Sequence, residues 1–70
     1  MLVIQLKNAL DPYSRVIIAK PNYREPEARG REILFDGKAA SIPELLTQRR
    51  VDSIYPVLVA NVSTLRIDLE

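Results

Sequence analysis

The chemistry open to this chain is limited first by what it lacks, because its 70 residues include neither histidine nor cysteine. Histidine is the commonest general base and metal ligand, and the cysteine thiolate is a strong protein nucleophile. Carboxylates, lysine, tyrosine, serine and threonine remain. We therefore expect no enzymatic activity, no catalytic or metal site and no cofactor.

Three groups of polar residues have a catalytic or metal interpretation, and each has a simpler structural one. Glu25 and Glu27 suggest a weak hard-cation site, but a calcium loop needs a denser set of oxygen ligands. Asp36 resembles a catalytic acid, yet Asp36-Gly37 is typical of a tight hairpin turn. Ser41 has no base to activate it and is explained as a helix cap.

A cluster of basic residues around one aromatic ring is the pattern with the clearest binding interpretation. Its members are Lys20, Tyr23, Arg24, Arg29 and Arg31. Single-stranded nucleic acid is held by bases stacked on aromatic rings and by phosphates on arginine. Glutamates alternate with these residues and would cancel much of the positive field, which favours a solvated loop with local ion pairs. Nucleic-acid binding is kept as the alternative function.

Composition and size indicate one small folded domain. The chain is 47% hydrophobic and 27% charged, with a net charge of +1, which is not the composition of a disordered chain. A domain of this length buries only about 60% of the surface of its unfolded chain. Without cysteine it has no disulfides, so its stability must come from a well-packed core or from a partner.

The N-terminal residues lack the features of a signal peptide. Their apolar run is short, no basic region precedes it, and no small-residue cleavage site follows it. No segment approaches the roughly 20 apolar residues that cross a bilayer. We therefore expect a cytoplasmic protein that does not bind membranes.

The hydrophobic pattern predicts an α+β fold with a small, mostly antiparallel sheet of four to five strands and one short helix. Alternating or β-branched residues favour strands. The expected strands cover residues 2–6, 15–20, 31–35, 54–60 and 64–70, with the first and last at the edges of the sheet. Turns are expected at residues 11–12, 36–37 and 61–63.

The helix is predicted over about residues 42–50. Ser41 and Glu44 have the spacing of a capping box, and Pro43 suits the first turn. Leu45 and Leu46 are expected to point inward. Residues 49 and 50 are arginines, which would complement the helix dipole at its C-terminal end.

Several predicted strands are apolar on both faces, and one short helix covers part of one face at most. Residues 16–19, 33–35 and 57–60 show this pattern. It predicts a homo-oligomer, with a twofold dimer as its simplest form, in which a second copy covers the other face. The competing interpretation is that residues 21–30 fold over that face. The predicted function is a non-catalytic protein–protein interaction module, acting as an assembly, adaptor or regulatory subunit.

Overall fold

Strand β1 (Arg15–Pro21) lies in the interior of the sheet, between β2 (Arg31–Lys38) and β4 (Val62–Leu69). The computed structural model describes residues 1–21 and 31–70. Over these residues the sheet has the order β2-β1-β4-β3, with β3 spanning Val51–Val59. The β1–β2 and β3–β4 pairs are antiparallel, while β1 and β4 run parallel. The predicted α+β class, with a small and mostly antiparallel sheet, is confirmed.

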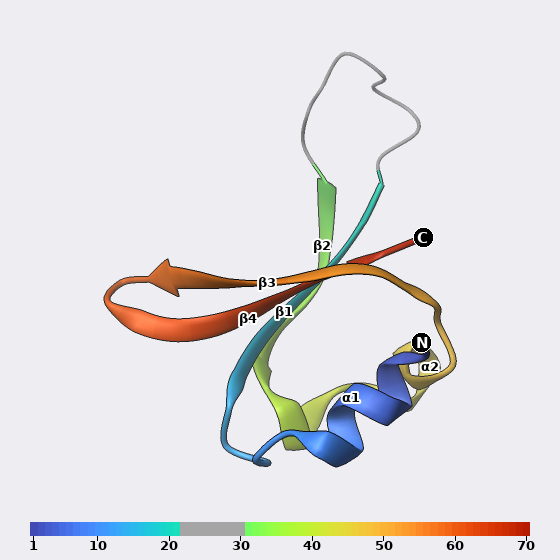
Figure 1. Cartoon of the computed structure of the whole chain (residues 1–70), viewed down its shortest axis with the longest axis horizontal. Helices are drawn as coiled ribbons and strands as arrows, with labels where there is room; N and C mark the ends of the chain where they lie inside the picture. The colour runs from blue at the N-terminus through green and yellow to red at the C-terminus, as the bar shows by residue number, and fades with distance from the viewer. Residues whose placement is uncertain (22–30) are drawn as a thin grey trace.

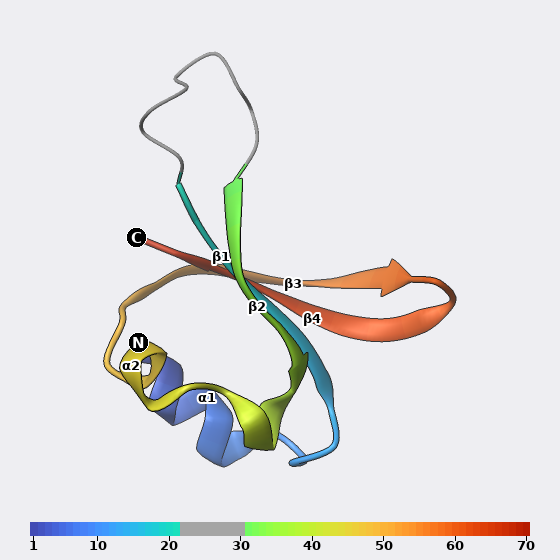
Figure 2. The same cartoon turned by 180° about the vertical axis from the view of Figure 1, so that it is seen from behind.

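Short helices cover one face of this sheet. They are α1 (Val3–Ala9), the 3-10 turn η1 (Ala39–Ser41) and α2 (Glu44–Thr47). The β1–β2 hairpin and the β3–β4 hairpin cross where β1 meets β4. The helices lie together on one side of this crossing (Figures 1 and 2). We call the covered side the helix face and the opposite side the open face. In the described residues, no helix is long and apolar enough to cross a membrane.

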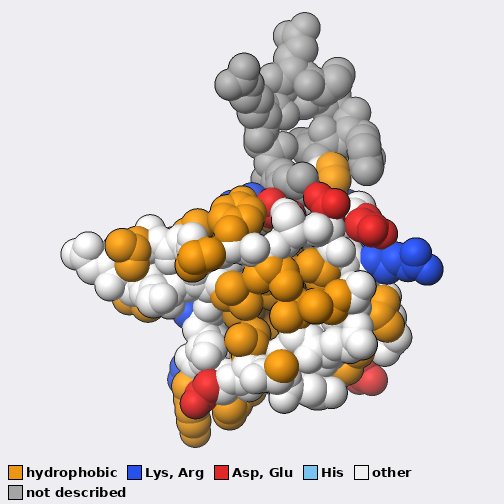
Figure 3. Space-filling view, in the orientation of Figure 1, with side chains coloured by type: hydrophobic (Ala, Val, Ile, Leu, Met, Phe, Trp, Pro, Cys, Tyr) orange, Lys and Arg blue, Asp and Glu red, His pale blue; other side chains and the backbone are white. Residues whose placement is uncertain are grey.

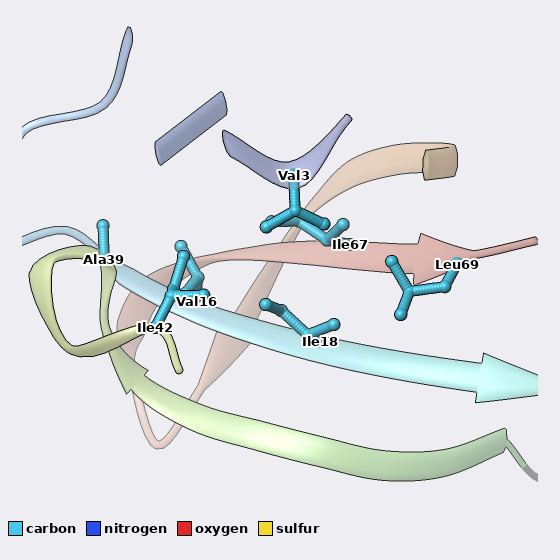
Figure 4. Packing of buried hydrophobic residues seen from close by; sticks show 7 residues of the cluster. All are labelled: Val3, Val16, Ile18, Ala39, Ile42, Ile67 and Leu69. Carbon is cyan, nitrogen blue, oxygen red and sulfur yellow. The ribbon is translucent and has the colours of Figure 1, made fainter. Parts of the chain in front are cut away.

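The core lies between the helix face and the helices. Side chains from β1 and β4 meet side chains from α1, η1 and the segment before α2 (Figure 4). Burying an aliphatic side chain of this size contributes about 1.5–3 kcal/mol relative to leaving it exposed. The buried cluster consists of Val3, Val16, Ile18, Ala39, Ile42, Ile67 and Leu69.

The N-terminal segment forms the helix α1, so the strand predicted over residues 2–6 is wrong. Val3, Leu6 and Leu10 have the spacing that places side chains on one side of a helix. Val3 is fully buried, and the other two pack against the same cluster. The helix start is closed by the backbone N–H of Leu2, which donates to Gln5 Oε1 at 2.8 Å. Five residues are too few to distinguish the two-residue period of a strand from the 3.6-residue period of a helix.

The helix predicted over residues 42–50 is present as α2 but is shorter at both ends. The expected capping box does not form, because Ser41 belongs to η1 and the N-cap position is Pro43, which has no side-chain cap. Leu46 packs against the core as predicted. Leu45 was also expected to point inward, yet 91% of it is exposed.

The end of α2 is set by a contact with the chain terminus. The backbone N–H of Val3 donates to the carbonyl of Arg49 at 3.0 Å, and that of Val51 donates to the carbonyl of Met1 at 2.8 Å. These bonds flank an antiparallel bridge between Leu2 and Arg50 and hold residues 49–51 beside residues 1–3. The helix therefore ends at Thr47 and not at residue 50.

The predicted turn at Asp36-Gly37 is also wrong, because β2 continues through both residues. Gly37 pairs with Val16 and does not adopt the positive φ that a tight hairpin turn requires. Its lack of a side chain has another cause. A Cβ atom there would lie 3.0 Å from Cζ of the Phe35 ring, so glycine makes room for that ring.

The β3–β4 turn is one residue earlier than predicted. Ala60 and Asn61 have φ values of 50° and 64°, which fits a two-residue turn with both central residues in the left-handed region. β4 then begins at Val62 and pairs on both sides, so it is not the predicted edge strand. In the described residues the edges are β2 and β3, and Pro56 lies on the edge strand β3, where its missing N–H is tolerated.

The two leucines of α2 give a matched test of this packing. We expect Leu46→Ala to lower the free energy of unfolding by about 2 kcal/mol, because it removes buried methyl groups. Leu45→Ala should change it by less than about 0.5 kcal/mol, since that side chain lies in solvent. Urea denaturation followed by circular dichroism measures both. Equal losses in the two variants would contradict the orientation of α2.

Candidate interaction surfaces

The structure places the predicted basic cluster only in part. Lys20 lies near the end of β1, and its Nζ is 3.2 Å from Glu32 Oε2. Arg31 begins β2 opposite Pro21, so the two predicted cations lie on neighbouring strands. The charge of Lys20 is balanced by its ion pair. The remaining predicted binding residues lie outside the described residues: Tyr23, Arg24 and Arg29.

The two predicted loop carboxylates, Glu25 and Glu27, also lie outside the described residues. Within residues 1–21 and 31–70, no group of three or more acidic side chains is placed to hold a metal ion. Ser41 lies in η1 and is exposed. Asp36 lies in strand β2, where it is paired with an arginine.

The open face carries a network of charged and polar side chains. Asp36 accepts two hydrogen bonds from Arg15 of the neighbouring strand, from Nε and from Nη2, each 3.1 Å long. These hydrogen bonds and the negative charge of Asp36 raise the pKa of Arg15 above its ordinary value. Both side chains are partly exposed, so solvent screens the ion pair, and its main effect is to position β2 on β1.

A second part of the network lies over β4 and β3. Arg66 Nε donates to Asp68 Oδ1 at 2.9 Å, and the Tyr55 hydroxyl donates to Asp68 Oδ2 at 3.1 Å. Asp68 is only 4% exposed. Its carboxylate is therefore held by a cation and a neutral donor together, as a buried charge requires.

The network lies on the same face of the sheet as the second set of apolar residues of β1. Ile17 pairs with Asp36 on one side and with Arg66 on the other, and Ala19 pairs with Asp68. Ile17 is 9% exposed and Ala19 is fully buried within the single chain. These two residues therefore do not require a second copy for cover, and the homo-oligomer stays a prediction. The competing cover by residues 21–30 rests on residues 22–30, which lie outside the described residues.

The outer half of the β3–β4 hairpin presents a different surface. This hairpin projects from the rest of the described residues, and no described helix lies over its tip (Figures 1 and 2). No charged residue occurs between Ser53 and Leu65, which is the longest uncharged stretch of the chain. We call residues 53–65 the hairpin arm.

The arm is apolar on both faces. The pairing of Pro56 with Leu65 places both residues on the helix face, and alternation places Leu58 there too. Tyr55, Val57 and Val62 belong to the open face by the same alternation. Leu58 is 76% exposed, Val62 47% and Tyr55 40%. Both faces of the arm therefore expose apolar side chains.

The two faces differ in what lies next to the arm. On the helix face, Leu65 is partly buried and packs against the hydrophobic core, so the neighbours of the arm toward α1 are apolar. Figure 3 shows hydrophobic side chains between the strands and α1, and again along the projecting hairpin. On the open face, the arm is followed by the charged network of Arg15, Asp36 and Arg66. The more continuous apolar surface is on the helix face.

The free edge of β3 is interrupted at its centre. In a two-residue hairpin, the pair flanking the turn exchanges hydrogen bonds, here Val59 with Val62, and bonded pairs then alternate with non-bonded ones. The Pro56–Leu65 pair is a non-bonded one, so the backbone of Pro56 points to the free edge. Proline has no N–H to offer there, and a further strand would lose a hydrogen bond at this position.

Comparison with protein-family models, with curated proteins and with solved structures finds no match to this chain. The candidate surfaces therefore rest on the geometry alone. The sequence prediction does not single out the arm, because Leu58 belongs there to a set of strand residues that all need cover. The signal that identifies it is the uncharged stretch from Ser53 to Leu65.

Two tyrosines allow a matched test of the open-face network. We expect Tyr55→Phe to lower the free energy of unfolding by about 1 kcal/mol, because it removes a hydrogen bond to the buried Asp68 carboxylate. Tyr13 is 76% exposed, and its ring lies 5.3 Å from Lys38 Nζ. Tyr13→Phe keeps that ring and should cost less than about 0.5 kcal/mol. Urea denaturation compares them, and an unaffected Tyr55→Phe variant would contradict the network.

Proposed function

We propose that this chain is a small non-catalytic protein–protein interaction module, an assembly, adaptor or regulatory subunit, which self-associates as a dimer. The observation that carries the proposal is the hairpin arm, which is uncharged, exposed and apolar on both faces. Most of a protein surface mixes charged with apolar groups. A projecting element without any charge is suited to a contact with another protein surface.

The energetics of a hairpin support this interpretation. A two-stranded hairpin without further cover is only marginally stable in water. In the arm, the pairs Leu58–Ser63 and Val59–Val62 extend past the point where β1 begins to pair with β4, at Thr64, and no described helix lies over them. Covering the exposed Leu58 and its neighbours would gain about 25 cal/mol per Å² of apolar area. A partner on the arm therefore stabilises both the contact and the hairpin itself.

Nucleic-acid binding is less well supported by the described residues. Affinity for nucleic acid depends on cations that release counterions from phosphates. Lys20 is paired with Glu32, Arg15 with Asp36 and Arg66 with Asp68. Each of these pairs would have to be given up before its cation contacted a phosphate.

The proposal predicts self-association. In sedimentation equilibrium, the apparent mass of the chain should rise with concentration from 8.0 kDa toward twice that value. Association should persist at about 1 M salt, because apolar contacts are not screened while ion pairs are. A mass that stays at 8.0 kDa into the high micromolar range would contradict self-association.

A titration with fluorescent single-stranded DNA or RNA serves as the control for the alternative. The interaction module should show no binding below about 10 µM at physiological salt. Tight binding that weakens steeply as salt rises would instead support a nucleic-acid function, since the salt dependence scales with the number of phosphates contacted.

A further inference from the structure

We infer that the dimer contact is the helix face of the hairpin arm, packed against the same face of a second copy around a twofold axis. This inference rests on the proposed function and specifies its surface. The contact is centred on Leu58, with Pro56 and Leu65 beside it. The partner is thus a second copy of this chain, and the contact is made by faces and not by strand edges.

Pairing of an edge strand with a strand of a second copy is disfavoured. The free edge of β3 would have to supply a regular row of donors and acceptors to a new strand. Pro56 interrupts that row at the middle of the strand, where it has no N–H. The other edge strand, β2, carries charged residues toward both of its ends, including Glu32, Asp36 and Lys38. Charged side chains on an edge strand oppose pairing with another strand.

The absence of charge on the arm favours a second copy as the occupant. A twofold contact brings a surface against itself, so any charge near the axis meets its own equivalent. Residues 53–65 form the longest segment of the chain in which no such repulsion arises. A neutral apolar surface is complementary to itself, whereas a charged partner would find no counter-charge on the arm.

Charge also selects between the two faces of the arm. A copy placed on the open face would extend over the network and bring Arg15 and Arg66 near their own equivalents. A copy placed on the helix face meets Leu65 and the apolar surface that continues toward α1. The arm alone is about 10 Å wide, as two strands spaced by about 4.8 Å require. That continuation is needed to approach the area of a stable dimer, about 800 Å² per partner.

Three exposed apolar residues allow a direct test by sedimentation equilibrium of the full chain. Leu58 lies on the helix face of the arm, Val62 on its open face, and Leu45 on α2. We expect Leu58→Glu to weaken the dimer by at least about tenfold, because it buries a charge against its equivalent. Val62→Glu and Leu45→Glu should change the dissociation constant by less than about threefold, the effect of a charge outside the contact. Far-UV circular dichroism checks that each variant folds.

A second measurement does not depend on introducing a charge. The chain has no cysteine, so any thiol cross-link must join introduced residues. Leu58→Cys should be cross-linked into a covalent dimer by a short bis-maleimide, and more rapidly than Leu45→Cys or Val62→Cys.

The outcomes separate this inference from the proposed function. If the wild-type chain dimerises but Leu58→Glu does not weaken the dimer, the assigned face is wrong and the interaction module stands. A dimer lost in Val62→Glu instead moves the contact to the open face and overturns the inference. If the wild-type chain is monomeric at high concentration, both the second copy and the proposed self-association are excluded.

Discussion

The parallel pairing of β1 with β4 is the contact on which the rest of the structure depends. It joins Arg15 to Thr64 and continues to Ala19 and Asp68, while the other strand pairs are antiparallel hairpins formed by neighbouring segments. A two-stranded hairpin is marginal alone, and four strands with a covered face are not. The pairing also places Ile18 beside Ile67, and this creates the apolar face of the sheet on which α1 packs.

The same pairing determines which strands of the sheet are interior and which are exposed at its edges. It places β1 and β4 inside, and it leaves the edges to β2 and β3. The helices available to cover this sheet are short, with seven residues in α1 and four in α2. They cover the region where the hairpins cross, and the outer half of the β3–β4 hairpin extends beyond them (Figure 1). The exposed arm is thus a consequence of long strands combined with little helix.

Strands with a clear alternation of apolar residues or a run of β-branched residues were predictable from the sequence. The alternation of residues 64–70 and the β-branched run of residues 15–20 both became strands, because their apolar residues fit a pleated surface with one or two covered faces. The fold class followed from these elements and from the turn residues between them. The neighbours of β1 were not predictable in the same way, since the strand parallel to it, β4, is distant in sequence.

The elements that were predicted wrongly are those whose structure depends on contacts between segments distant in the sequence. Residues 2–6 alternate as a strand would, but Val3 is buried only because the segment coils as a helix over β1 and β4. Gly37 looked like a turn residue, and its glycine instead accommodates the Phe35 ring. The predicted helix stopped early because Met1 and Val3 take hydrogen bonds with residues 49–51. In each case a tertiary contact outweighed a local preference worth about 1 kcal/mol or less.

The position of Pro56 explains how an uncharged arm is compatible with a discrete assembly. An apolar strand with a free edge is a template for open-ended pairing, and such strands are commonly guarded by charges or proline. β3 has no charge beyond Asp52, so Pro56 is the guard that its sequence provides. Blocking the edge leaves the faces of the arm as the surfaces for the proposed contact. A face contact about a twofold axis closes after two copies, whereas edge pairing adds strands without limit. The arm can therefore remain apolar, as a binding surface requires, without favouring fibres.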